Sequence, residues 1–235
     1  MIKSRVLLAG ALVLSSIGAA QADSSFTVTP ALVSDYDFRG ISQTAKDPAL
    51  QVGATYTGDS GFYLGGWASN VNFGAGDPKT EIDLTTGYTW GDAKASGAFD
   101  AGVVYYTYVS KSDYNYPEVY LGYTKDWFNA KVFYSWDFGG LGQTAWYLST
   151  TGTFPLPSDF ALVAHAGYST GDYWDKNYGN GYVDWSVGVT KAIGKFTVGL
   201  SFIDGSDLKD VPGKVFDTRS KVVASISTTL PWGKD

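Results

Sequence analysis

The sequence contains no cysteine in 235 residues, and it has only one methionine and one histidine. Without cysteine no disulfide framework can stabilise the chain, so stability has to come from a large core or from a closed sheet. Long apolar stretches are also missing. Since a helix needs roughly 20 apolar residues to cross a bilayer, the sequence predicts no transmembrane helix.

Basic residues are scarce as well, with 17 Lys and Arg against 23 Asp and Glu and a net charge of −6. No cluster of Lys and Arg occurs along the chain. Phosphate binding depends on such clusters, so the composition argues against nucleic acid as a partner.

The start of the chain has the layout of a secretory signal. Lys3 and Arg5 precede a mostly apolar stretch over residues 6–14, and small residues follow as far as Ala22. We expect residues 1–22 to be a signal peptide cleaved after Ala22. No Pro- or Ser-rich linker divides the remainder, so we expect residues 23–235 to form a single domain.

Glycine and aromatic residues are abundant, with 29 Gly, 17 Tyr, 13 Phe and 8 Trp. This composition favours strands and turns over helices. The clearest strand covers residues 182–191, where Val183, Trp185 and Val187 alternate with polar or glycine residues. Such alternation is typical of a strand with one apolar and one polar face.

The same alternation predicts twelve strands, with ten or fourteen left as possible counts. They lie at residues 25–36, 49–57, 61–71, 80–90, 98–109, 117–125, 128–137, 143–154, 160–169, 181–191, 195–204 and 218–230.

Short and long connections alternate between these strands. Turns such as 58–60 and 193–194 are tight, whereas connections such as 37–48 and 205–217 are longer and more polar. Bacterial outer-membrane barrels have short periplasmic turns and longer external loops. The sequence therefore predicts an all-β fold, a transmembrane antiparallel up-and-down β-barrel of about twelve strands with both termini in the periplasm.

A soluble barrel or sandwich is the alternative, because it would show the same alternation with its apolar face inside. The signal sequence, strands of about ten residues and aromatic residues near strand ends favour the membrane. We place these aromatic residues at a periplasmic rim (Tyr88, Trp90, Tyr123, Trp127) and at an outer rim (Tyr108, Trp136, Tyr168).

The segment SDYDFRGISQ, residues 34–43, resembles the opening motif of the TorF-like family, a proteobacterial group regarded as outer-membrane porins. Further segments at 47–51, 60–63, 69–71 and 81–83, together with Trp67, follow that family's pattern in order. The resemblance covers the N-terminal third of the chain. It implies an outer-membrane, porin-like role.

Two features depart from the family pattern. Thr85 stands where an aromatic residue is expected, and the chain ends in a short tail after Trp232 rather than on a terminal aromatic residue. Within the motif we take Asp35, Tyr36, Arg39 and Gly40 as candidate channel-mouth residues.

If the apolar face meets lipid, the opposite positions point into the lumen. The candidate lumen-lining residues are Glu81, Asp83, Asp100, Glu118, Lys131, His165, Asp184 and Lys221. This mostly acidic set indicates either a pore that favours small cations or a network of ion pairs that fills a narrow barrel. Arg39 could line the mouth of the channel. The favoured alternative is that it forms a salt bridge within its own loop, with Asp35 or Asp37, or donates hydrogen bonds to loop carbonyls.

Catalytic and metal sites find little support in the sequence. A serine hydrolase would have to use His165, the single histidine, and no Gly-x-Ser-x-Gly motif accompanies it. The acidic loops at 171–177 and 204–210 lack the ligand spacing of a calcium-binding loop. Gly139 to Gly142 is not expected to bind a nucleotide, because no helix is predicted after it.

The leading hypothesis is a passive diffusion channel for small polar solutes in the outer membrane of a Gram-negative bacterium. Its expected partners are the lipid bilayer and these solutes, with no cofactor, no metal and no nucleic acid. The alternative is a closed barrel that acts as a receptor or anchor through its external loops. An outer-membrane hydrolase is a third, weaker possibility.

Overall fold

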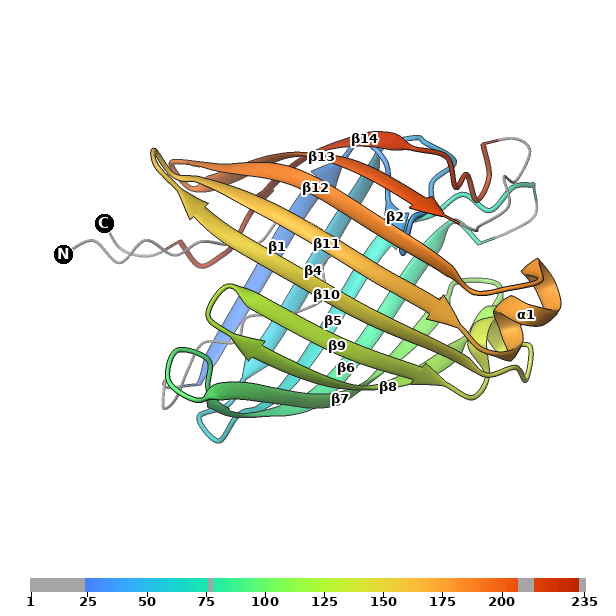
Figure 1. The fold of residues 1–235 in the computed structure, drawn as a ribbon, viewed down its shortest axis with the longest axis horizontal. Coiled ribbons are helices and arrows are strands. Elements are labelled where there is room, and N and C mark those ends of the chain that lie inside the picture. The colour runs from blue at the N-terminus through green and yellow to red at the C-terminus, as the bar shows by residue number, and fades with distance from the viewer. Residues whose placement is uncertain (1–23, 76–77, 207–213, 233–235) are drawn as a thin grey trace.

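Twelve antiparallel strands close into a barrel in the computed structural model, which describes residues 24–75, 78–206 and 214–232 (Figure 1). Every barrel strand after the first is paired with the barrel strand before it. The sheet closes where Ala31–Val33 of the first strand pair with Ser225–Ser227 of the last. The predicted up-and-down barrel is confirmed. The expected signal peptide, residues 1–22, lies outside the described residues.

The twelve barrel strands are β1 Ser25–Val33, β4 Ala49–Thr57, β5 Phe62–Asn70, β6 Thr80–Asp92, β7 Gly97–Tyr108, β8 Tyr116–Lys125, β9 Phe128–Ser135, β10 Ala145–Leu156, β11 Phe160–Thr170, β12 Tyr182–Ile193, β13 Phe196–Ser206 and β14 Lys221–Thr228. Five short elements complete the described fold: β2 Asp37–Phe38, β3 Ile41–Ser42, the 3-10 turns η1 Ser112–Tyr114 and η2 Phe138–Gly140, and the helix α1 Asp172–Tyr178.

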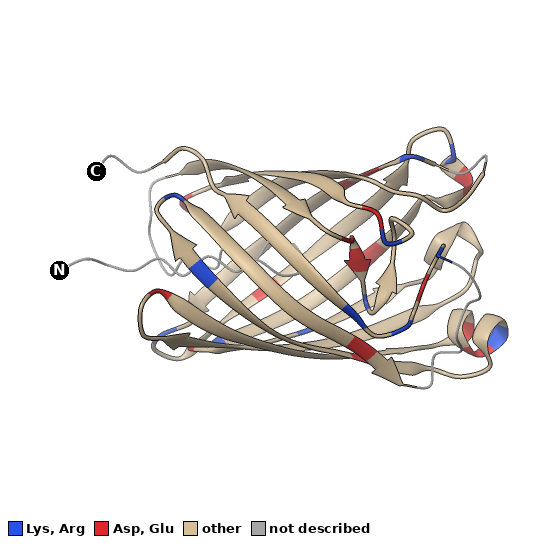
Figure 2. Cartoon of the chain, turned by 90° about the horizontal axis from the view of Figure 1, so that it is seen from above, with Lys and Arg blue, Asp and Glu red and all other residues tan. Residues whose placement is uncertain are grey.

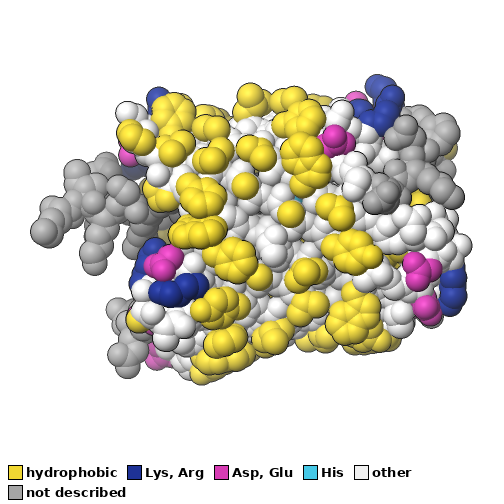
Figure 3. All heavy atoms as spheres, in the orientation of Figure 1, with side chains coloured by type: hydrophobic (Ala, Val, Ile, Leu, Met, Phe, Trp, Pro, Cys, Tyr) yellow, Lys and Arg dark blue, Asp and Glu magenta, His cyan; other side chains and the backbone are white. Residues whose placement is uncertain are grey.

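The two faces of each strand have opposite character. In β6, Glu81 and Asp83 are buried inside the barrel. Leu84, which follows Asp83 and points to the other face of the strand, is 55% exposed. Apolar side chains cover the outside in a broad band, and charged residues gather toward the two ends of the molecule (Figure 3). The barrel is therefore apolar outside and polar inside, the reverse of a soluble protein.

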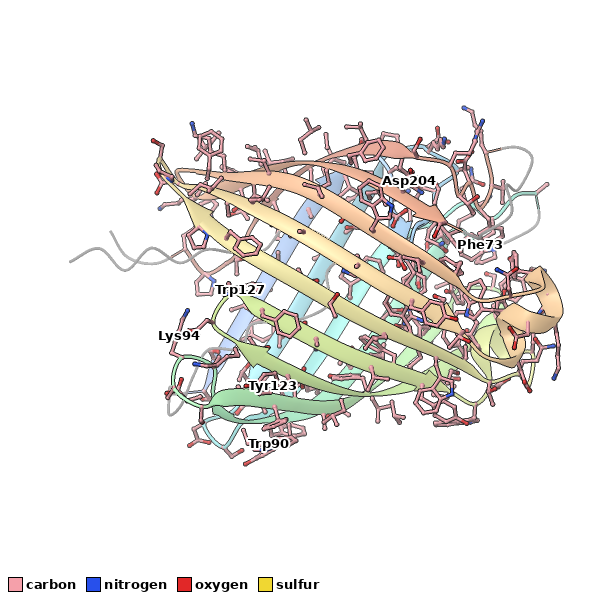
Figure 4. All side chains as sticks on the ribbon, viewed as in Figure 1. Phe73, Trp90, Lys94, Tyr123, Trp127 and Asp204 are labelled. Atoms are coloured by element: carbon pink, nitrogen blue, oxygen red, sulfur yellow. The ribbon has the colours of Figure 1, made fainter. Side chains whose placement is uncertain are left out.

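The two ends of the barrel also differ. Short turns connect strands at the end where β1 begins and β14 ends, and longer connections with α1 occupy the opposite end (Figure 1). Trp90, Tyr123 and Trp127 lie at the turn end, as expected for a rim of aromatic side chains (Figure 4).

Tyr108 lies at the predicted end of the barrel, where β7 meets a longer connection, but its side chain does not face lipid as expected for a rim of aromatic residues. Its hydroxyl donates a hydrogen bond to the buried Glu81, at 3.1 Å, and its ring packs on Phe73 with ring centroids 5.5 Å apart. The side chain therefore faces the interior, because it shares the inward parity of Tyr106 on the same strand.

The helix α1 was not predicted from the sequence. It is seven residues long, begins after Gly171 and ends at Gly179 in the left-handed conformation (φ 91°). Within the described residues, no helix is long and apolar enough to cross a membrane.

Candidate functional site

The connection after β1 folds into the barrel, where an external loop was expected. Its strands β2 and β3 form a small hairpin, here called the inner hairpin (residues 37–42), which lies between the barrel walls (Figure 2). Arg39 and Gly40 form its two-residue turn with positive φ angles of 54° and 83°, the geometry of a tight hairpin turn. Ser42 and Thr44 have no exposed surface. The inner hairpin is thus part of the interior.

Arg39 anchors the inner hairpin to the wall formed by β8. Its two terminal nitrogens donate to the two carboxylate oxygens of Glu118, at 3.0 and 2.6 Å, and its guanidinium lies 4.2 Å from the ring centroid of Tyr147. Burial by itself would lower the pKa of Arg39, but the ion pair with Glu118 outweighs burial and raises this pKa above its usual range. The predicted salt bridge within the loop is wrong, because the partner comes from a distant strand.

The other side of the hairpin is held by β12 and β14. Tyr182 donates its hydroxyl hydrogen to the Arg39 carbonyl at 2.9 Å, and Lys221 donates to the Gly40 carbonyl at 3.1 Å. Lys221 also forms an ion pair with Asp37 at 2.6 Å. Burial raises the pKa of Asp37, although Lys221 acts in the opposite direction. The hairpin therefore bridges strands from different sides of the barrel.

A second connection, residues 214–220, fastens the hairpin from the long-loop end. The Ser42 amide donates to the Asp217 carbonyl at 2.9 Å, and Lys46 forms an ion pair with the Asp217 carboxylate at 3.0 Å. Arg219 also binds this carboxylate. Burial opposes ionisation of Asp217, but the hydrogen bonds from Arg219 and Lys46 outweigh it and lower the pKa of this carboxyl to about 2.

Nearer the turn end, Asp100 and Lys131 form another buried ion pair at 2.6 Å. Asp100 also accepts a hydrogen bond from the Tyr63 hydroxyl at 2.7 Å, and that hydroxyl is hydrogen-bonded to Tyr120. The ammonium of Lys131 lies 4.7 Å from the Tyr120 ring centroid. This charge pair is fully compensated within the wall of β7, β8 and β9.

His165 lies in a third cluster. One ring nitrogen, Nε2, is 3.0 Å from both the Tyr147 hydroxyl and an Asp184 carboxylate oxygen, and Nδ1 is 3.2 Å from the Thr151 hydroxyl. Both ring nitrogens thus have hydrogen-bond partners, and Tyr147 donates to the same Asp184 oxygen at 3.1 Å. These hydrogen bonds hold the side chains of the cluster in fixed positions relative to one another.

Glu81 and Asp83 form a pair of neighbouring carboxylates in the interior. They occupy successive inward positions of β6 and are 2% and 9% exposed. Among the described residues neither forms an ion pair, and the oxygens Glu81 Oε2 and Asp83 Oδ1 have no hydrogen-bond partner. The indole nitrogen of Trp67, whose residue pairs with Asp83 across the sheet, is also unpartnered.

The candidate lumen-lining and channel-mouth residues named from the sequence all lie in the interior. The structure brings together Arg39 with Glu118, Asp100 with Lys131, and His165 with Asp184. Asp35 accepts hydrogen bonds from Ser42 and Thr44 of its own loop.

The sequence did not single out Tyr147, Tyr182 or Asp217 as site residues. The two tyrosines could have been found from the sequence, because they occupy inward-facing positions of β10 and β12. No local sequence pattern distinguishes Asp217. No group of three or more His, Cys, Asp or Glu side chains able to hold a metal ion occurs in the described part of the chain.

A family model described as "Bacterial protein of unknown function (Gcw_chp)" matches residues 19–230. The chain belongs to the Gcw_chp family. No match was found among curated protein sequences. The TorF-like resemblance stays a prediction.

Three solved structures similar to this Gcw_chp protein are described as porins or as an outer-membrane channel. The KdgM porin aligns over 88% of this chain and 99% of its own, with a TM-score of 0.57 at 8% identity. The NanC porin aligns over 87% and 98%, with a TM-score of 0.57 at 10% identity. An outer-membrane channel from Pseudomonas putida F1 aligns over 92% and 97%, with a TM-score of 0.51 at 10% identity. At these identities the likeness concerns the fold, which is that of a porin-like barrel.

Proposed function

We propose that this protein is an outer-membrane channel through which small polar solutes diffuse. The observation that carries the proposal is the inverted barrel, apolar outside and ionic inside. A charged side chain facing lipid near the bilayer midplane costs about 2–4 kcal/mol for Lys or Arg, and the buried Arg39, Lys131 and Lys221 all avoid that position. The fold shared with KdgM and NanC, both described as porins, supports the same role.

The orientation follows from the two unlike ends. Short turns face the periplasm in outer-membrane barrels and long connections face outward. We therefore place both termini in the periplasm and α1 on the external side, after export directed by residues 1–22.

The inner hairpin is the feature that sets the width of the proposed path. It crosses the interior and is held by the ion pairs of Arg39 and Lys221. Buried charges around it are unequal, with seven carboxylates (Asp35, Glu81, Asp83, Asp100, Glu118, Asp184, Asp217) and three cations (Arg39, Lys131, Lys221) among the described residues. A pore lined in this way favours small neutral or cationic solutes over anions.

A liposome-swelling assay tests the proposal. Liposomes that contain the purified, folded protein are placed in isotonic solutions of neutral solutes of increasing size, with protein-free liposomes as the control. We expect swelling with the smallest polar solutes and a sharp loss of swelling with size, because the hairpin narrows the path. Equal behaviour with and without protein contradicts a diffusion channel.

A closed barrel that acts as a receptor or anchor is the second candidate, and the tight burial of the inner hairpin favours it. In that case liposomes with protein would not swell, even with the hairpin weakened by Arg39→Ala. A hydrolase has the least support, because both ring nitrogens of His165 have structural partners. It would require hydrolytic activity that His165→Ala abolishes.

A further inference from the structure

The buried charges of the interior are compensated unevenly. Glu118 is paired with Arg39, Asp100 with Lys131, and Asp37 with Lys221. Asp217 is bound by Lys46 and Arg219, and Asp184 lies beside His165. Asp35 has no ion pair within the part of the chain that the structure describes, but it accepts two hydroxyl hydrogen bonds from its own loop. Only β6 carries two adjacent carboxylates that lack a counter-charge among the described residues.

Among the described residues, the surroundings of this carboxylate pair supply hydroxyl groups and no cation. Tyr108 donates its hydroxyl hydrogen to Glu81 at 3.1 Å. Tyr36, on the connection after β1, is close to both carboxylates: burial raises the pKa of Tyr36, and the charges of Glu81 and Asp83 raise it further. The Tyr36 ring also packs on Trp67, with ring centroids 5.2 Å apart. The connection after β1 therefore caps the pair.

Two buried carboxylates without counter-charges form an unfavourable arrangement, because removing a charge from water is costly unless an opposite charge replaces the solvent. Each is at least nine-tenths buried. Each also has an oxygen without a hydrogen-bond partner, as do Asp35, Asp37 and Asp184. What distinguishes the two β6 carboxylates is that they are neighbours and have no counter-charge among the described residues. Carboxylate and hydroxyl oxygens are the ligands of hard cations such as Mg²⁺, which binds through one or two carboxylates and keeps much of its water.

We propose that Glu81 and Asp83 form the cation-binding site of the barrel interior and determine which ions pass. The site takes small hard cations, monovalent ions in transit and divalent ions with longer residence, because the charge of the two carboxylates balances one divalent cation. The selectivity part rests on the proposed channel function, whereas binding at the pair does not depend on conduction.

Ion selectivity tests the first part. Reversal potentials across a planar bilayer in a KCl gradient give the ratio of K⁺ to Cl⁻ permeability. We expect a cation-selective wild type and a several-fold fall of this ratio toward unity in Glu81→Gln/Asp83→Asn. The matched control is Asp172→Asn/Asp175→Asn on α1, which removes two exposed carboxylates outside the interior and should leave the ratio near that of the wild type.

Binding is measured separately with Tb³⁺, a luminescent ion with the ligand preference of a hard cation. Excitation of Trp67, the cross-strand partner of Asp83, should sensitise Tb³⁺ emission in the folded wild type. Mg²⁺ should compete for the site. We expect the emission to be lost in Glu81→Gln/Asp83→Asn and strongly reduced in Trp67→Phe. It should persist when the exposed acidic pair of α1 is removed in Asp172→Asn/Asp175→Asn.

The outcomes separate the two proposals. A protein that never conducts but shows Tb³⁺ emission dependent on the pair contradicts the channel and retains the binding site. Emission or selectivity that is unchanged in Glu81→Gln/Asp83→Asn overturns the cation site. If the double variant does not fold, the single variants Glu81→Gln and Asp83→Asn are measured instead. Each should show a lower ratio of K⁺ to Cl⁻ permeability and weaker Tb³⁺ emission than the wild type, and no change in either would overturn the cation site.

Discussion

At the scale of single residues, the interior depends on glycine where large inward side chains need room. Gly102 on β7 lies opposite Tyr120, and a Cβ atom at Gly102 would contact the Tyr120 hydroxyl and lie 2.5 Å from the Thr86 carbonyl oxygen. By contrast, a Cβ atom at Gly53 on β4 would meet Trp67 at an ordinary distance of 3.6 Å.

Gly102→Ala is therefore expected to lower the free energy of unfolding by about 1–3 kcal/mol through overpacking, because a backbone oxygen cannot move away freely. Urea unfolding of the refolded barrel measures the effect, with Gly53→Ala as the matched control. Equal stability of the two variants would show that the glycine is not needed for the tyrosine.

Asp217 gives a prediction for pH. Its folded-state pKa of about 2 is lower than the unfolded value of about 3.9. A lowered pKa means that its ion pairs stabilise the fold above the unfolded pKa, and that this stabilisation is lost as the pH falls through about 2. We expect the hydrogen-exchange protection factor of the Ser42 amide, which is bonded to the Asp217 carbonyl, to decrease between about pH 4 and pH 2. Asp217→Asn should have low protection throughout; high protection in this variant would contradict the role of the carboxylate.

At the scale of elements, the inner hairpin is held by ion pairs that are almost inaccessible to solvent. The side chains of Arg39 and Glu118 are 5% and 1% exposed. Removal of one partner from a buried pair costs about 3–5 kcal/mol because it leaves the other charge uncompensated.

Arg39→Ala should therefore destabilise the protein by about that amount, and Arg39→Ala/Glu118→Gln should recover part of the loss, since no orphan charge remains. Denaturant unfolding of both variants, with Glu118→Gln to complete the double-mutant cycle, measures the coupling. Additive effects of the two substitutions would exclude a direct pairing in the folded state.

The strands could be predicted from the sequence, whereas the path of the inner hairpin could not. Period-two alternation and turn residues are local signals, so all twelve strands, such as 182–191 observed as Tyr182–Ile193, were found within a few residues. The inner hairpin is positioned by partners far away in the chain, Glu118 and Lys221, which no local pattern connects to Arg39 or Asp37. The short helix α1 has too few turns to produce a periodic signal.

The same distinction applies to the candidate site. The alternation of side chains along a strand predicted that residues such as Glu81 and Asp184 face inward, and they are buried because one face of each strand is covered. This alternation does not reveal which charged side chains form ion pairs with one another. That is why the sequence placed Arg39 in a local salt bridge, and why the uncompensated state of Glu81 and Asp83 became visible only in three dimensions.

At the scale of the whole molecule, the apolar exterior distinguishes a membrane barrel from a soluble one. Leu84 on β6 is 55% exposed within the apolar band. Leu84→Arg should destabilise the barrel folded in lipid by about 2–4 kcal/mol, because the charge would face hydrocarbon. Urea unfolding from lipid vesicles measures this effect. A cost near zero, as for a charge placed in water, would contradict insertion in a bilayer.

The proposed function requires that the barrel conducts and that the inner hairpin limits the current. Single-channel recording in a planar bilayer tests it most directly, with the wild type and Arg39→Ala/Glu118→Gln compared in the same salt. We predict discrete conductance steps for the wild type and larger steps for the variant, in which the hairpin has lost its main anchor. Absence of steps in both folded proteins would contradict the claim.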